Sequence, residues 1–109
     1  KKAILDADQR STVMIKESIG APARVLRNEW TDKILELESQ QAGYEGLKDY
    51  ISGKANKRFI HDGVEEEGFG WAGQVSWRID DIPTVVDLFN RIVEEAADIG
   101  ERLGQVIQK

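Results

Sequence analysis

The sequence of 109 residues contains no cysteine, only two prolines and a single histidine. Without cysteine there can be no disulfide and no thiolate metal site, and one histidine excludes a metal site built from several histidines. No apolar run approaches the roughly 20 residues that a helix needs to cross a bilayer. We therefore expect no bound metal and no insertion into a membrane.

Basic residues are also in the minority, since 15 Lys and Arg stand against 20 Asp and Glu, for a net charge of −5. Affinity for nucleic acids comes largely from Lys and Arg that neutralise phosphates, so this balance argues against a nucleic-acid surface. The length suffices for one small hydrophobic core and not for two. We expect one globular piece in the cytoplasm.

The first half of the chain alternates between extended and helical patterns. Residues 1–7 have the spacing of the last turns of an amphipathic helix, which suggests the C-terminal portion of a larger protein. The β-branched residues of 11–15 predict a short strand, and 23–26 are either extended or the start of a helix. Asn28 can cap a helix over 29–39, whose apolar residues recur every three or four positions.

The middle of the chain is more polar. The helical spacing of apolar residues predicts a second helix over 44–52. Residues 54–67 carry most of their charge in runs, which we interpret as a solvated surface with a loop at the acidic run 65–67.

The last segment carries the most regular pattern of the chain. Its apolar residues step alternately by four and three: Val85, Phe89, Ile92, Ala96, Ile99, Leu103 and Val106. This spacing predicts a helix over 84–107, with Pro83 in its first turn and Thr84 and Asp87 as a capping box. Two readings stay open: packing against a parent domain, or a helical interaction module that forms homo-oligomers without catalysis.

No residue is assigned a catalytic role from the pattern alone. His61 has acidic neighbours, but their spacing does not match a calcium loop. Asp80 and Asp81 are interpreted as capping residues before the last helix. The stretch GFGWAGQ, residues 68–74, lacks both the glycine spacing and the lysine of a phosphate-binding loop.

Two groups of residues nevertheless resemble a known family. Towards the N-terminus, a helix with lysine is followed by Thr and by Gly-x-Pro-x-Arg-x-Leu-x-Asn, here Lys2, Thr12, Gly20, Pro22, Arg24, Leu26 and Asn28. Further on, Gly63, Gly68, Gly73 and Gln74 match a Gly-Asp-x-x-x-Gly…Gly-Gln pattern. Ser11 and Val64 depart from it, because the family has acidic residues there. In order and spacing these motifs resemble the C-terminal part of the nitronate monooxygenases, and they are also similar to the flavin-dependent enoyl-acyl-carrier-protein reductases.

The resemblance implies a mainly α piece with short extended segments, from the C-terminal part of an α/β TIM-barrel flavoenzyme. Residues 1–109 would form one piece, with a helix-rich covering-domain segment at roughly 11–79 and a closing helix at 80–109. FMN would be bound mainly by residues outside this chain, and the isolated piece would be inactive. The full enzyme would oxidise small alkyl nitronates with dioxygen.

The resemblance also singles out GFGWAGQ as a flexible, hinge-like segment that approaches the flavin pocket. In this reading Trp71, Gly73 and Gln74 belong to the substrate pocket. The Gln74 amide would donate to a substrate oxygen or to the flavin, or else bond to its own turn. Trp71 and Phe69 would form an apolar wall over the substrate, or else pack in the core. Arg24 and Asn28 would pair structurally between two domains.

Overall fold

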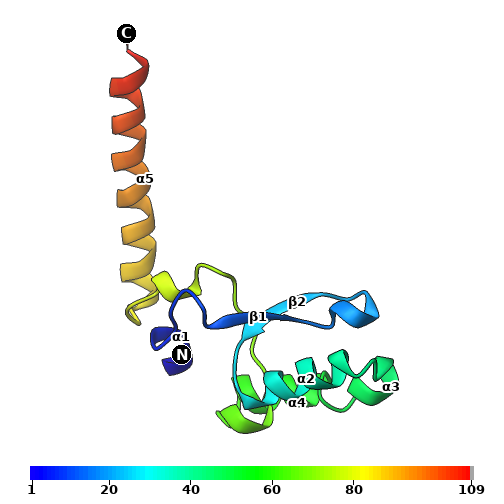
Figure 1. Cartoon of the computed structure of the whole chain (residues 1–109). Coiled ribbons are helices and arrows are strands. Elements are labelled where there is room, and N and C mark those ends of the chain that lie inside the picture. Colours follow the sequence, from blue (N-terminus) through cyan, green and yellow to red (C-terminus); the bar gives the residue numbers. More distant parts are fainter. Residues whose placement is uncertain (109) are drawn as a thin grey trace.

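The computed structural model describes residues 1–108, which are mainly helical with one two-stranded sheet (Figure 1). The helices and strands are α1 (Lys2–Leu5), β1 (Thr12–Ile15), β2 (Ala23–Leu26), α2 (Glu29–Ser39), α3 (Gly43–Leu47), α4 (Gly53–Ile60) and α5 (Val85–Ile107). Three short 3₁₀ turns lie between them: η1 (Glu17–Ile19), η2 (Glu65–Glu67) and η3 (Ser76–Arg78).

β1 and β2 form an antiparallel hairpin in which Thr12 lies opposite Leu26 and Ile15 lies opposite Ala23. The predicted strand is confirmed, and of the two readings for 23–26 the extended one is correct. The tip of the hairpin is fastened to α2, because the backbone N–H and the hydroxyl of Ser18 donate to the Glu38 carboxylate at 3.2 and 2.8 Å.

The predicted helix over 29–39 is confirmed as α2, and Asn28 is its N-cap. The Asn28 side chain accepts from the Thr31 N–H at 2.8 Å, while the Thr31 hydroxyl accepts from the Asn28 N–H at 2.9 Å. This reciprocal pair satisfies two backbone donors at the start of the helix, so the buried Thr31 has its polar atoms paired.

The next two elements differ from the prediction. The helix expected over 44–52 ends at Leu47, whose carbonyl instead accepts turn bonds from the N–H groups of Tyr50 and Ile51 at 2.9 and 3.1 Å. Ser52 then caps a separate helix, α4, in the stretch interpreted as solvated surface. Most of its charged side chains are exposed, while Ala55 on its inner side is buried. The acidic run, expected as a loop, forms a short 3₁₀ turn.

The hydrophobic core takes one fully buried side chain from each of six segments: Ile15, Val25, Ile34, Leu47, Ala55 and Phe69. Aromatic side chains close one side of it, since the Trp30 and Tyr50 rings lie 5.0 Å apart and the Trp30 indole N–H donates to the Tyr50 carbonyl at 2.9 Å. We call residues 11–72, which contribute this core, the packed unit.

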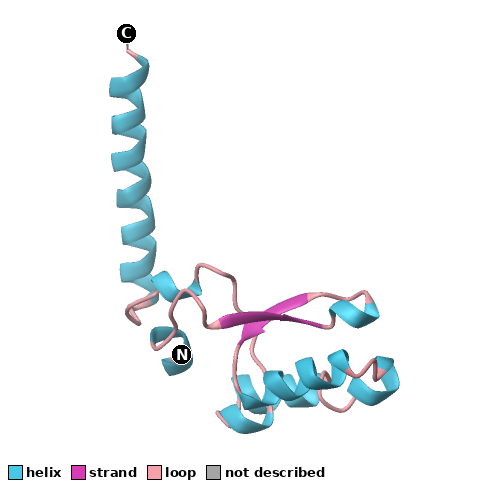
Figure 2. Ribbon diagram, in the orientation of Figure 1, coloured by secondary structure: helices cyan, strands magenta, loops and turns pink. Residues whose placement is uncertain are grey.

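α5 is the predicted last helix, and its bounds confirm the periodicity. The Thr84 hydroxyl accepts from the Asp87 N–H at 3.2 Å and donates to the Asp87 carboxylate at 2.7 Å. Pro83 precedes this cap and does not lie in the first turn as predicted. Figure 2 shows α5 extending away from the sheet and the other helices, and no residue of it is buried.

The dimensions of the chain reflect this arrangement. Its radius of gyration is 18.6 Å, whereas a compact domain of this length has one of about 13 Å. The chain therefore consists of a compact part and a helix that packs on little of it.

Candidate functional site

Residues 70–72 of the stretch GFGWAGQ lie along β2 and form an isolated bridge with it, and we call residues 68–72 the edge strand. The Leu26 N–H donates to the Gly70 carbonyl at 2.9 Å, and the Ala72 N–H donates to the Arg24 carbonyl at 3.3 Å. Val25 and Trp71 lie opposite one another in an antiparallel bridge. The interpretation of this stretch as a flexible hinge is therefore wrong for its first five residues, since residues 70–72 are bonded to β2, Phe69 is buried and Gly68 lies against α4.

Two glycines in the stretch are required by the approach of α4. A Cβ atom on Gly68 would overlap the carbonyl oxygen of Ala55, and one on Gly70 would overlap the ring of Phe59. The backbone here lies against the helix, and any larger residue would push the two apart. The glycines therefore serve packing within the unit, and they form no cradle for a flavin phosphate.

Two amide side chains fix the position of this edge strand. Asn28 donates through Nδ2 to the carbonyls of Glu65 and Gly68 at 2.8 and 3.0 Å. Asn56 of α4 donates to the Phe69 carbonyl at 2.9 Å. Asn28 therefore caps α2 and anchors the edge strand at once, in a pairing that lies within the packed unit.

The alternation of the strand sends its two aromatic rings to different places. Phe69 is fully buried in the core, so the reading of it as a substrate wall is wrong. Trp71 is 50% exposed. Its ring meets that of Phe69 edge to face at 5.3 Å and 88°, and the Lys16 ammonium lies 5.1 Å from its centroid. A fixed, exposed indole beside a cation is suited to contact a small molecule.

Gly73 and Gln74 follow the edge strand and are both exposed. Gly73 lines an open groove of about 540 Å³ together with Arg78 of η3 and Glu95 of α5. Within residues 1–108, the Gln74 side-chain amide forms no hydrogen bond, so the reading that it bonds to its own turn finds no support there. Trp71 and Gln74 do not line this groove.

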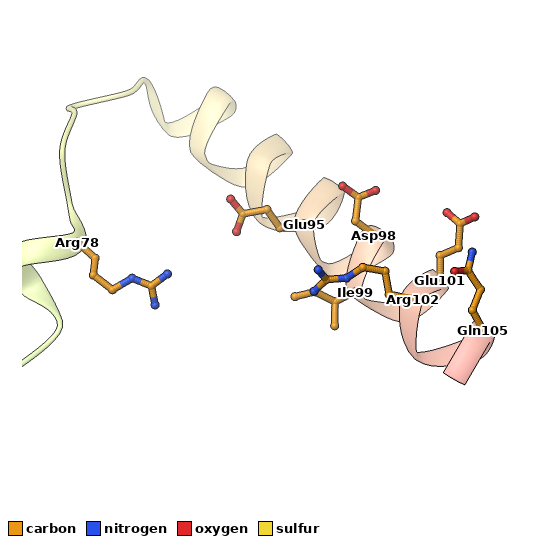
Figure 3. A pocket seen from close by; sticks show the side chains of 7 residues that line it. All are labelled: Arg78, Glu95, Asp98, Ile99, Glu101, Arg102 and Gln105. Carbon is orange, nitrogen blue, oxygen red and sulfur yellow. The ribbon is translucent and has the colours of Figure 1, made fainter. Parts of the chain in front are cut away.

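A second groove, of about 650 Å³, adjoins the first through Arg78 and Glu95 (Figure 3). Its lining is strongly charged and comes mostly from α5, which contributes Glu95, Asp98, Glu101, Arg102 and Gln105 of its polar face and Ile99 of its apolar face. The groove is open, and its lining consists mostly of solvated charged side chains.

The remaining candidates lie apart from this edge. His61 is the exposed C-cap of α4. Asp81 pairs with Arg91 of α5 through two bonds of 2.7 and 3.3 Å, and does not cap the helix as expected. This bond raises the pKa of Arg91, so the guanidinium stays charged. Among residues 1–108 no three metal-binding side chains come together, and no helix is long and apolar enough to cross a membrane.

The motif residues Thr12, Arg24, Leu26 and Asn28 of the N-terminal half have structural roles in the hairpin and at the start of α2. The Arg24 guanidinium donates to the Thr12 hydroxyl at 3.1 Å across the two strands, so Arg24 pairs within the packed unit. Leu26 is buried and Asn28 caps α2. The residues that carry the resemblance in this half therefore specify the fold of the unit that holds the edge strand.

The comparisons with known proteins agree with this geometry. The model of the family "Nitronate monooxygenase" matches residues 1–95. This match covers the packed unit, the edge strand and the first half of α5, and the chain belongs to the nitronate monooxygenase family.

Two solved structures are similar over nearly the whole chain. FabK from Thermotoga maritima superposes with a TM-score of 0.86 and 30% identity, over 98% of this chain and 33% of FabK. A single-residue mutant of the same FabK gives a TM-score of 0.77 and 30% identity, over 98% of this chain and 31% of the mutant. The chain thus spans about a third of the length of these relatives.

Sequence reasoning missed Lys16, Arg78 and Glu95. Lys16 reaches Trp71 because its backbone takes a left-handed conformation, with φ of 65°, at the end of β1. Such a conformation is uncommon for a lysine and has no signal in the local sequence. Arg78 and Glu95 line the same two grooves although they lie far apart in the sequence, a proximity that no local pattern predicts.

Proposed function

We propose that this chain is the C-terminal, substrate-covering part of an FMN-dependent TIM-barrel oxidoreductase that oxidises alkyl nitronates with dioxygen. The observation that carries the proposal is the family match over residues 1–95, which includes the edge strand and Trp71. The structural likeness to FabK over 98% of the chain supports the same class of flavoenzyme. We place the complete protein in the cytoplasm.

FMN, when bound, supplies the redox chemistry of such an enzyme. Within residues 1–108 the close-approaching glycines contact α4, and the cations near the edge strand are exposed, so we assign no flavin contact to this chain. The isolated chain is accordingly expected to be colourless and inactive.

The role of this chain is then to bind and enclose the substrate. Trp71 offers an apolar surface whose position is fixed by the sheet and by the Phe69 ring. Gln74, two residues beyond the last sheet bond, offers amide donors to a nitro oxygen. Gly73 keeps the groove beside Arg78 free of a side chain.

The test uses the complete protein and measures oxygen uptake with an alkyl nitronate. Gln74→Ala should lower kcat/KM by about tenfold, the effect of one lost hydrogen bond of roughly 1.4 kcal/mol. Gln9→Ala, an exposed amide in the turn before β1, is the matched control and should leave the rate unchanged. Equal rates for all three proteins would remove Gln74 from the pocket, and absence of nitronate-dependent uptake would overturn the function.

A second function is favoured by the likeness to FabK, which is a flavin-dependent enoyl-acyl-carrier-protein reductase. The two functions differ in their electron donor, because the reductase consumes NAD(P)H and reduces an enoyl thioester. Oxidation of NAD(P)H that depends on an enoyl thioester, without nitronate-dependent oxygen uptake, would assign the complete protein to this second function.

A further inference from the structure

Lys16 has an unusual backbone conformation at the end of β1. Its φ of 65° and ψ of 18° lie in the left-handed region, which a residue with a Cβ atom adopts at a cost in free energy. The conformation is held from both sides, because Ile15 pairs with Ala23 in the sheet and the Ala21 N–H donates to the Lys16 carbonyl at 3.1 Å. Glycine adopts it without that cost, as Gly20 does at the other end of the same turn. A lysine here therefore points to a use for its side chain.

The Lys16 side chain is held over an aromatic ring. Its ammonium group lies 5.1 Å from the centroid of the Trp71 ring, a distance at which a cation is attracted to the ring face. The backbone of Trp71 is fixed by the bridge to Val25, and its ring by the edge-to-face contact with the buried Phe69. The position of the ammonium is therefore set by the core of the packed unit.

The charge of Lys16 is not neutralised by a carboxylate. Within residues 1–108 its ammonium forms no salt bridge and no hydrogen bond, whereas those of Lys33 and Lys48 contact Glu36 and Glu45 at 3.1 and 2.7 Å. A ring face attracts the charge but accepts few of the three N–H donors of a lysine. The ammonium can therefore still pair with an anionic oxygen of a ligand.

An alkyl nitronate matches these two side chains in charge and shape. It carries one negative charge shared by the two oxygens of a planar group, whereas the parent nitroalkane is neutral. The ammonium offers the countercharge, and the exposed part of the Trp71 indole offers an apolar surface to the alkyl group. A charged donor adds more to binding than a neutral one, since hydrogen bonds to ionised groups are about twice as strong.

We propose that Lys16 is a specificity-determining residue of the complete enzyme, whose ammonium pairs with the negatively charged group of the substrate. Trp71 is the positioning residue that holds this ammonium in place. The pair favours an anionic ligand over a neutral one of the same shape. The inference rests on the proposed function for the identity of the substrate, and its test therefore includes a measurement of binding without turnover.

The first measurement is oxygen uptake by the complete protein with ethyl nitronate. Lys16→Met should lower kcat/KM about tenfold, mainly by raising KM, because it removes an attraction that is already present in the bound substrate. Lys16→Arg keeps the charge and its attraction to the ring, and should retain most of the wild-type value. Lys33→Met removes the same charge from the exposed side of α2 and is the matched control, with no change expected.

The second measurement is the binding of propanoate and of its neutral analogue propanamide, followed by saturation-transfer NMR. Lys16→Met should raise the dissociation constant of propanoate about tenfold and change that of propanamide less than about twofold. Rising ionic strength should weaken propanoate binding more steeply in the wild type than in Lys16→Met, because salt screens the attraction. Lys16→Gly removes the same ammonium and relieves the left-handed backbone, so it should bind like Lys16→Met and melt no lower than the wild type.

The two measurements separate a failure of the inference from a failure of the proposed function. Oxidation of ethyl nitronate that is unchanged in Lys16→Met and Lys16→Gly would overturn the inference and leave the proposed function standing. Equal weakening of propanoate and propanamide would also overturn it, because Lys16 would then shape the pocket without recognising charge. Propanoate binding that depends on Lys16, in a protein without nitronate-dependent oxygen uptake, would support the anion site and overturn the proposed function.

Discussion

The packed unit and α5 use the same kinds of apolar residue to opposite effect. In the packed unit, six segments each contribute one fully buried apolar side chain to the core, and two asparagine amides hold the edge strand in place. α5 is longer and more regular, yet buries no residue. The comparison shows that a regular helical pattern predicts an apolar face but not that the face is buried within the same chain. An irregular, glycine-rich segment can still contribute a side chain to the core.

The comparison predicts a large difference between two identical substitutions in the 109-residue chain. Leu47→Ala empties a fully buried site in the packed unit and should lower the free energy of unfolding by about 2–5 kcal/mol. Leu103→Ala removes a side chain that is 54% exposed on α5, and should change it by less than about 0.5 kcal/mol. Urea unfolding followed by tryptophan fluorescence checks both values, and similar losses would contradict the division.

Within GFGWAGQ, the glycines should differ just as clearly. Gly68→Ala forces a Cβ atom against the Ala55 carbonyl, so α4 and the edge strand must separate at a cost of about 1–3 kcal/mol. Gly73→Ala meets nothing within 4 Å and serves as the matched control. Thermal unfolding should place Gly68→Ala well below Gly73→Ala, and equal melting temperatures would mean that the edge strand does not lie against α4.

The two helix caps sharpen the comparison further. Asn28→Asp keeps the acceptor that caps α2 but loses the amide donors to Glu65 and Gly68. Each lost bond contributes about 1 kcal/mol, so the variant should unfold more easily by about 2 kcal/mol. Thr84→Ala removes only the cap of the exposed α5 and should cost about 1 kcal/mol of helix stability. Circular dichroism and fluorescence together separate the two effects; a larger loss from Thr84→Ala would contradict the anchoring role of Asn28.

The smallest expected effect concerns the turn between α1 and β1. The Arg10 N–H and the Ser11 hydroxyl donate to the Asp8 carboxylate at 2.7 and 3.1 Å, which holds the pKa of Asp8 below its usual 3.8. A lowered pKa means that the turn is stabilised at any pH above about 4, and that this contribution is lost as the pH falls through the lowered value. Titration by NMR should show the Asp8 midpoint moving up in Ser11→Ala, and an unchanged midpoint would contradict the bond.

The sequence predicted those parts of the fold that depend on local patterns. The strand at 11–15, the Asn28 cap, α2 and α5 follow from β-branching, capping and spacing alone. α4 was not predicted, because its composition is dominated by lysines and an arginine. These residues indicate an exposed face and give no sign of the one alanine that the helix buries. The helix expected over 44–52 ends at Leu47. Ser52, which was expected inside it, is instead the N-cap of α4.

For the candidate site, the resemblance located the stretch but not its arrangement. Trp71, Gly73 and Gln74 are exposed at one edge, as a pocket role requires, although only Gly73 lines the groove. The core position of Phe69 follows from strand alternation, which the glycines concealed in the sequence. Gly68 and Gly70 are required because α4 lies directly against them, and no local sequence pattern predicts this tertiary contact.

Amide hydrogen exchange on the dilute 109-residue chain tests the central claim most directly. The account predicts slow exchange at the Leu26 and Ala72 amides, which bond the edge strand to β2, and fast exchange along α5, whose face has no cover. Fast exchange at Leu26 and Ala72 together with slow exchange throughout α5 of the monomer would contradict it, because GFGWA would then be a free loop and α5 would be complete on its own.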